Sequence, residues 1–236
     1  MAIFRDLPNP QVDNFASGGP SRAGRYGESY TLPVTGKEWG AADEGTYYVA
    51  VNPTAGTGIV GPVSTTLDEA KALLCVYNGG QNRIYPQRMN LWVTVVGTTG
   101  TRQDYNFTID QGNRYSSGGT ALTKSNVNMD SVRTTGATIN FGALVTSAAS
   151  GSRRLMGNHQ IREAAIEIVG DQYTFIWGNN SNGGNSSGTR VATVADFQVE
   201  VQPMVIGPGQ SLLLHHWRTS ITVGVTFEVN FEYIER

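Results

Sequence analysis

Residues 222–235, TVGVTFEVNFEYIE, alternate between two kinds of residue without a break. The apolar and aromatic set consists of Val223, Val225, Phe227, Val229, Phe231 and Tyr233. Because successive side chains on a β-strand point to opposite faces, this period of two predicts a strand with one face suited to burial. A single strand cannot bury such a face alone. We therefore expect a second sheet to cover it, in a two-sheet all-β body.

The composition agrees with many strands joined by turns. The chain has 236 residues, of which 29 are glycine and 39% are hydrophobic, which suits one large β-sandwich. A net charge of −2 indicates neither nucleic acid nor an anionic membrane as partner. With one cysteine, Cys75, neither a disulfide framework nor a cysteine zinc cluster is expected, and we expect no cofactor. No signal peptide is visible, and no run reaches the roughly 20 apolar residues of a membrane span.

Residues 1–45 show neither the strand period nor the helix period. Their large apolar residues are scattered among prolines and glycines. We therefore expect an extended arm that packs against a neighbouring subunit. The residues predicted to make this contact are Ile3, Phe4, Leu7, Val12, Phe15, Tyr26, Tyr30 and Trp39.

Residues 46–236 are predicted to form the sandwich, with about ten strands in an antiparallel jelly roll. Clear strand patterns cover residues 46–52, 89–96, 103–110, 137–145, 211–217 and 222–235. We expect strand 73–78 to form a hairpin with strand 89–96, and residues 161–169 to pair with residues 173–177. Residues 191–206 are predicted as a long strand weakened at Pro203, and residues 111–135 as a polar surface loop. Thr66 and Glu69 fit a capping box, which predicts one or two helical turns over residues 67–72.

The motifs associated with catalysis lack the context that they need. Residues 56–61 match G-x-G-x-x-G, but Pro62 follows and no parallel βαβ unit surrounds them. Residues 184–188 match G-x-S-x-G within a run of Asn, Ser and Gly, where these letters recur by composition. His215 and His216 are adjacent on a strand and point to opposite faces, and His159 lacks a zinc motif, so we expect satisfied polar or surface histidines. No catalytic constellation emerges, and we expect a protein that is not an enzyme.

Several stretches resemble virion structural proteins of tailed bacteriophages, in which an N-terminal arm precedes a jelly-roll sandwich. They are RIYPQRMNLWVTVVG (83–97), DQGNRYSSGGTAL (110–122), SNVNMDS (125–131), GDQYTFIWG (170–178), GPGQSLLLHHW (207–217) and VNFEYIER (229–236). The resemblance implies a decoration, cement or minor capsid protein, made in the host cytoplasm and located in the virion. Its implied partners are the major capsid protein or other virion subunits, in a homo-oligomer with a trimer favoured. Neither nucleic acid nor a membrane is implied.

Two alternatives remain open. A phage tail or fibre protein, or a carbohydrate-binding β-sandwich module, would use loops 179–188 and 112–124 with exposed Tyr or Trp side chains. A cupin-like enzyme on the same architecture would need converging histidine and carboxylate ligands.

Overall fold

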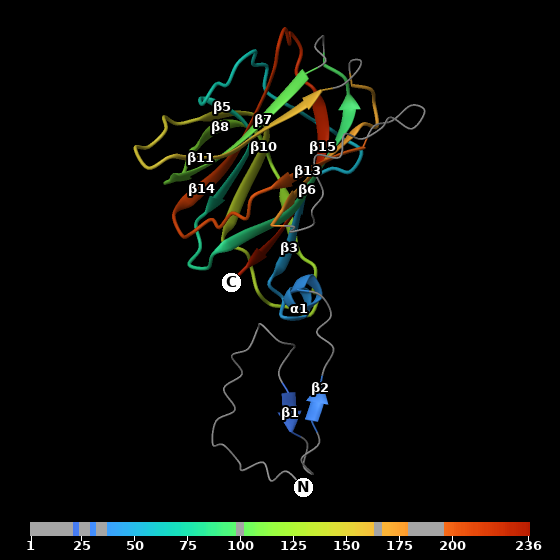
Figure 1. Cartoon of the computed structure of the whole chain (residues 1–236), viewed down its shortest axis with the longest axis vertical. Helices are drawn as coiled ribbons and strands as arrows, with labels where there is room; N and C mark the ends of the chain where they lie inside the picture. Colours follow the sequence, from blue (N-terminus) through green and yellow to red (C-terminus); the bar gives the residue numbers. More distant parts are fainter. Residues whose placement is uncertain (1–20, 24–28, 32–36, 98–101, 163–166, 179–195) are drawn as a thin grey trace.

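The computed structural model describes residues 21–23, 29–31, 37–97, 102–162, 167–178 and 196–236. In these ranges the chain has fifteen strands and one helix, and most of the strands form two sheets that face each other (Figure 1). The expected all-β sandwich of two mainly antiparallel sheets is confirmed.

The first sheet has six strands, and all of their pairings are antiparallel. In spatial order they are β11 (Arg154–Arg162), β7 (Arg102–Gln111), β14 (Gln210–Arg218), β5 (Lys71–Asn78), β10 (Ala137–Thr146) and β8 (Tyr115–Ala121).

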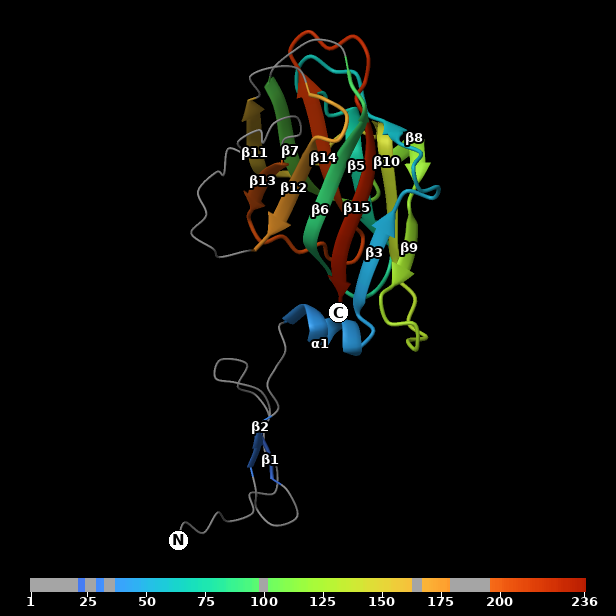
Figure 2. The ribbon, with the colours of Figure 1, turned by 90° about the vertical axis from the view of Figure 1, so that its right-hand side faces the viewer.

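The second sheet has seven strands. In spatial order they are β13 (Asp196–Val201), β12 (Gln172–Trp177), β6 (Ile84–Val95), β15 (Thr226–Glu235), β3 (Tyr47–Val51) and β9 (Thr123–Asn126), with β4 (Ile59–Val60) also paired to β15. All pairings are antiparallel except that of β12 with β13. In Figure 2 the strands β12, β6, β15 and β3 lie side by side, with β7, β14 and β5 behind them.

The connections are consistent with a jelly roll. Four strands of the first sheet lie in the order β5-β14-β7-β11, and four of the second in the order β3-β15-β6-β12. The chain changes sheet from β5 to β6, from β6 to β7, from β11 to β12 and from β14 to β15. Strands β8, β9 and β10, between β7 and β11 in the sequence, widen both sheets. Eight strands connected between two sheets in this way form the predicted architecture.

Strand β15 lies near the middle of its sheet and supplies the centre of the core. Phe227, Val229, Phe231 and Tyr233 are at most 3% exposed, and Glu228, Asn230 and Glu232 between them are only partly buried. The predicted alternation is therefore confirmed, although the strand begins at Thr226 rather than at residue 222.

Aromatic side chains from both sheets meet in the core. Phe107 on β7 packs edge-on against Phe175 and Trp177 on β12, with ring centroids 5.4 and 5.3 Å apart. Such edge-to-face contacts stabilise a pair of rings beyond the area that they bury. The two layers are therefore held in register by rings as well as by aliphatic packing.

Two predicted strand pairs are wrong. Strand β5 pairs with β10 and β14 in one sheet, whereas β6 pairs with β12 and β15 in the other. Of the predicted strand 161–169, residues 161 and 162 end β11, which pairs with β7, residues 163–166 lie outside the described residues, and residues 167–169 are not in a strand. Strand β12 pairs with β6 and β13. Strands that bury one face in the same core from opposite sides have the same period of two, so the pattern does not reveal which sheet each one joins.

Three predictions for connecting segments also need correction. The predicted loop 111–135 contains strands β8 and β9. No helical turn forms over residues 67–72, because Asp68 makes a turn in which its carboxylate accepts from Ala70 N and its carbonyl from Lys71 N, and β5 follows. The strand predicted over 191–206 spans only Asp196–Val201, ending before Pro203, and residues 191–195 lie outside the described residues.

Short elements also form within the predicted arm. Strands β1 (Ser21–Ala23) and β2 (Ser29–Thr31) pair with each other, and helix α1 spans Lys37–Asp43. Residues 1–45 show no helix period in the sequence, yet a helix forms near the C-terminal end of this segment. The helix forms because Ala41, which is fully buried, packs with Tyr47 and Ile234 of the body.

Candidate functional site

Most of the residues predicted to contact a neighbouring subunit lie outside the described residues. These are Ile3, Phe4, Leu7, Val12, Phe15 and Tyr26. Tyr30 is in β2, opposite Arg22 of β1. Trp39 is in α1, and its side chain is 73% exposed.

Helix α1 is fixed to one end of the sandwich. The Asn128 side-chain amide donates to the carbonyl of Asp43 at 3.0 Å, and that of Asn126 donates to the carbonyl of Gly45 at 2.9 Å. These bonds join the end of the helix to the segment that follows β9. Figure 2 shows the helix and this segment at the same end of the molecule.

Large apolar side chains are exposed at this end, which we call the α1 end and define by Trp39, Met129 and Val132. Their exposures are 73%, 98% and 96%. Single exposed apolar side chains are ordinary, but grouped ones indicate a contact surface. The α1 end is therefore our candidate for a contact surface, and the predicted subunit contact stays a prediction.

A second group of exposed apolar side chains, which we call the β4 end, consists of Val60, Val95 and Val223. These valines are 52%, 54% and 51% exposed. Val60 and Val95 flank Thr226 on either side, across three neighbouring strands. Thr226 is the first residue of β15, so this surface lies at the opposite end of the strand from α1. A strand of 10 residues separates the two ends by about 30 Å.

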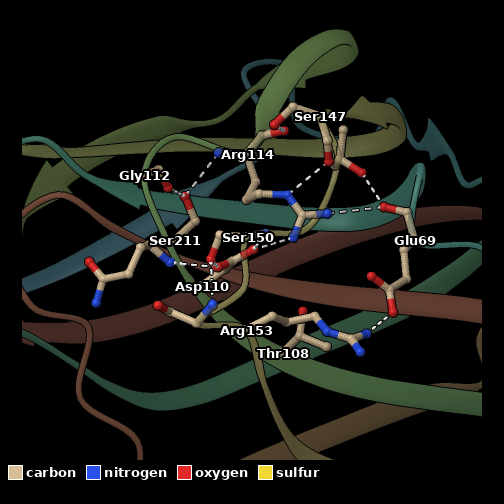
Figure 3. Close-up of polar contacts among 12 residues, drawn as sticks. Glu69, Thr108, Asp110, Gly112, Arg114, Ser147, Ser150, Arg153 and Ser211 are labelled. Atoms are coloured by element: carbon tan, nitrogen blue, oxygen red, sulfur yellow. Dashed lines mark hydrogen bonds and ion pairs between the residues drawn. The ribbon is translucent and has the colours of Figure 1, made fainter.

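The body also contains a buried polar network on the outer side of the six-stranded sheet (Figure 3). Asp110 and Arg114 form an ion pair at 2.5 Å, and their side chains are at most 3% exposed. Asp110 also accepts hydrogen bonds from the backbone amides of Gln111 and Ser150 and from the Ser150 hydroxyl. Arg114 donates to the carbonyls of Ser147 and Glu69.

The polar side chains of this network already form hydrogen bonds to one another and to the backbone. Burial alone raises the pKa of Asp110, but hydrogen bonds from Ser150, Arg114 and Gln111 outweigh it and hold that pKa below its usual value. A carboxylate that accepts this many bonds is a weak base and has little capacity left for a substrate. The network therefore ties three segments, around Glu69, Arg114 and Ser150, to the sheet.

Cys75, His215 and His216 are buried side chains on the strands of the six-stranded sheet. Burial raises the pKa of the Cys75 thiol to about 12, which leaves almost no thiolate at neutral pH. His215 bonds the carbonyl of Lys71 at 2.9 Å, and burial lowers its pKa. His216 packs on the opposite face, against Tyr105 in the core, as the alternation predicts. The prediction that every histidine is satisfied or at the surface is wrong for His216, whose two buried ring nitrogens have no hydrogen-bond partner among the described residues. It also fails for His159, which is partly buried and whose Nε2 likewise has no partner there.

Neither a metal centre nor a membrane segment emerges within the described ranges. No three His, Cys, Asp or Glu side chains there are placed to hold a metal ion. Among the described residues, no helix is long and apolar enough to cross a bilayer.

No protein-family model, curated protein or solved structure matches the chain.

The two apolar ends were only partly predictable. Trp39 is one of the contact residues that the sequence predicts, whereas Met129 and Val132 lie in the segment predicted as a polar loop. Val60, Val95 and Val223 fall in turns or at strand ends, and only the strand register brings Val60 and Val95 to either side of Thr226. In the sequence, these candidate contact residues are marked only by being large apolar residues within polar turns.

Proposed function

We propose that this chain is a non-enzymatic structural protein of a virion, which decorates or cements a bacteriophage capsid through its N-terminal arm and its jelly-roll body. The observation that carries the proposal is the exposure of apolar side chains at both ends of the sandwich. The α1 end holds Trp39, Met129 and Val132, and the β4 end holds Val60, Val95 and Val223.

Two contact surfaces on one subunit suit a cementing role. They lie about 30 Å apart, the length of a ten-residue strand, so that one subunit reaches two neighbours. Covering apolar surface stabilises an assembly by about 25 cal/mol per Å², less the cost of immobilising the subunits. Several weak contacts in a repeating shell reinforce one another, which offsets that cost.

The arm adds a third contact. Residues 1–36 precede α1 directly in the sequence. The partners in this proposal are the major capsid protein or other virion subunits, and the chain forms a homo-oligomer, with a trimer favoured. Its location is the virion.

The association state of the purified full chain tests the proposal first. Light scattering after size exclusion should give a defined oligomer, and deletion of residues 1–36 should lower its mass. The melting temperature should change little, because α1 and the sandwich remain. A wild-type chain that stays monomeric at high concentration would argue against the homo-oligomer.

The virion location needs its own experiment. In a lysate that contains this protein, the protein should sediment with intact particles in a caesium chloride gradient. The deletion of residues 1–36 should reduce the amount that sediments with particles. Wild-type protein found only in the soluble fraction would contradict the proposal.

A further inference from the structure

A polar groove lies on the outer face of the seven-stranded sheet. It has a volume of about 210 Å³ and crosses strands β6, β12 and β13. Its polar lining consists of Arg88, Asn90, Gln172, Thr174, Asp196 and Gln198. Figure 2 shows these three strands side by side in the nearer layer.

The strand register arranges the side chains of this face in rows. The middle row contains only uncharged groups that form hydrogen bonds, and its members are Gln198, Thr174, Asn90 and Asn230. One flanking row contains Asp196, Gln172, Trp92 and Glu228. The register of three neighbouring strands therefore forms the groove, with amides and a hydroxyl along its floor.

The groove differs from the Asp110 network because several of its polar groups remain available. The Gln172 amide donates to the Thr174 hydroxyl at 3.1 Å, which leaves that hydroxyl free to donate in turn. The side-chain amides of Asn90 and Gln198 form no hydrogen bond with any described residue, and the Arg88 guanidinium forms no hydrogen bond or ion pair there. Asn90 is nevertheless only 9% exposed. Its amide atoms are not among the buried side-chain groups that lack a partner, so they stay open to the groove, where a ligand can hydrogen-bond to them.

The charges on this face decide the class of ligand. Asp196, Glu200, Glu228 and Glu232 point outward from β13 and β15, and Arg88 is the one cation among the described outward residues of β6, β12, β13 and β15. This excess of negative charge opposes phosphates, nucleic acids and acidic sugars. Amides and hydroxyls match the hydroxyls of a neutral sugar, because both sides donate and accept.

Trp92 supplies the apolar contact that a sugar also needs. It is half-buried on the same face, directly opposite Gln172 in the groove and Glu228 on β15. A tryptophan ring presents a flat apolar surface with a polar tip, which suits the aliphatic face of a pyranose. We propose that this groove binds one residue of a neutral saccharide, with Asn90 and Thr174 bonding its hydroxyls and Trp92 packing against its ring.

The volume limits the strength of the interaction. At about 210 Å³ the groove is smaller than the 300–1,000 Å³ of sites for drug-sized ligands. Binding by one subunit is therefore weak. Many copies on one particle would raise the apparent affinity, and only this step rests on the proposed function.

The test uses the full-length chain on a printed array of neutral and sialylated oligosaccharides, followed by saturation-transfer NMR with the bound sugars. Trp92→Ala and Asn90→Ala should each weaken binding about tenfold or more, the loss expected for one well-placed contact. Trp217→Ala and Asn140→Ala are matched controls, because these residues lie on the outer face of the other sheet with similar burial. Thermal melts verify that all four variants fold, and Trp92→Phe replaces Trp92→Ala if that variant does not.

Each outcome is decisive. Selective binding of neutral sugars that is lost in the groove variants and kept in the controls supports the site. No binding to any neutral sugar, equal binding by the groove variants, or a preference for sialylated sugars overturns it. The association of the chain with particles is measured separately, so failure of this proposal leaves the proposed function standing.

Discussion

His216 stacks on Tyr105 in the core between the two sheets, with ring centroids 4.8 Å apart and ring planes 29° apart. Phe227 packs edge-on against the same imidazole at 6.0 Å. Burial, followed by the positive charge of Arg218, lowers the pKa of His216 to about 3. The imidazole therefore takes the place of an aromatic core ring and stays neutral in the folded protein.

This burial makes the protein sensitive to acid. The unfolded chain binds a proton at this histidine below about pH 6.5, whereas the folded protein does so only near pH 3. The free energy of unfolding is therefore complete above pH 6.5 and falls as the pH decreases towards 3. At pH 5 the loss is about 2 kcal/mol from this residue.

The variant His216→Phe should reduce this pH dependence, because the buried ring can no longer be protonated. Urea denaturation at pH 7 and pH 5 measures the effect in both proteins. Some dependence should remain, since burial also lowers the pKa values of His159 and His215. An unchanged loss of stability between pH 7 and pH 5 would show that His216 is not the source.

The buried ion pair of Asp110 and Arg114 gives a second prediction. Replacing Arg114 by Met leaves the Asp110 carboxylate buried without its cation, and such a loss costs about 3–5 kcal/mol. The matched control is Arg236→Met, because Arg236 pairs with Glu44 at the surface, where side-chain exposures are 42% and 58%. This exposed pair should contribute less than about 1 kcal/mol. Similar losses for both variants in urea denaturation would contradict a special role for the Asp110 network.

The sequence predicted those features that depend on a local period. The alternation in residues 222–235 identified the buried face of β15, with Phe227, Val229, Phe231 and Tyr233 inward. The same reasoning located β3, β7, β10 and β14 nearly within their observed bounds. These successes arise because one face of each strand must be apolar, whichever strand lies beside it.

Pairing and short elements could not be predicted in this way. The period of two is the same in β5 and β6, although they belong to opposite sheets. Strand β8 is rich in Ser and Gly and lacks an apolar face, so that it resembles a loop. The groove likewise requires Asn90, Thr174 and Gln198 to be neighbours, which only the register of three strands establishes.

Gly142, at the bulge in β10, provides the third prediction. Gly142 has a φ of +113°, and an added Cβ would lie 2.5 Å from Ile59 Cγ2. Gly142→Ala should therefore lower the free energy of unfolding by about 2 kcal/mol or more, from backbone strain and overpacking together. Gly40→Ala in α1 should have the opposite sign and add up to about 1 kcal/mol, because no atom lies within 4 Å of its added Cβ. Equal effects of the two changes in urea denaturation would refute this assignment.

The two apolar ends give the last prediction. Trp39→Ser with Met129→Ser changes the α1 end, and Val60→Thr with Val95→Thr changes the β4 end. Because these side chains are 52–98% exposed in the single chain, neither double variant should change the melting temperature by more than a few degrees. Each should nevertheless weaken association, since the apolar area covered in a contact is lost at one end.

Sedimentation velocity measures the association of these variants and of a control double variant, Val145→Thr with Leu155→Ser. The control separates an effect of the two ends from an effect of exposed apolar side chains in general. The control side chains are 48% and 56% exposed on strands β10 and β11, outside both ends. If the control lowers the mass as much as either end variant, apolar exposure in general drives association and the ends have no special role.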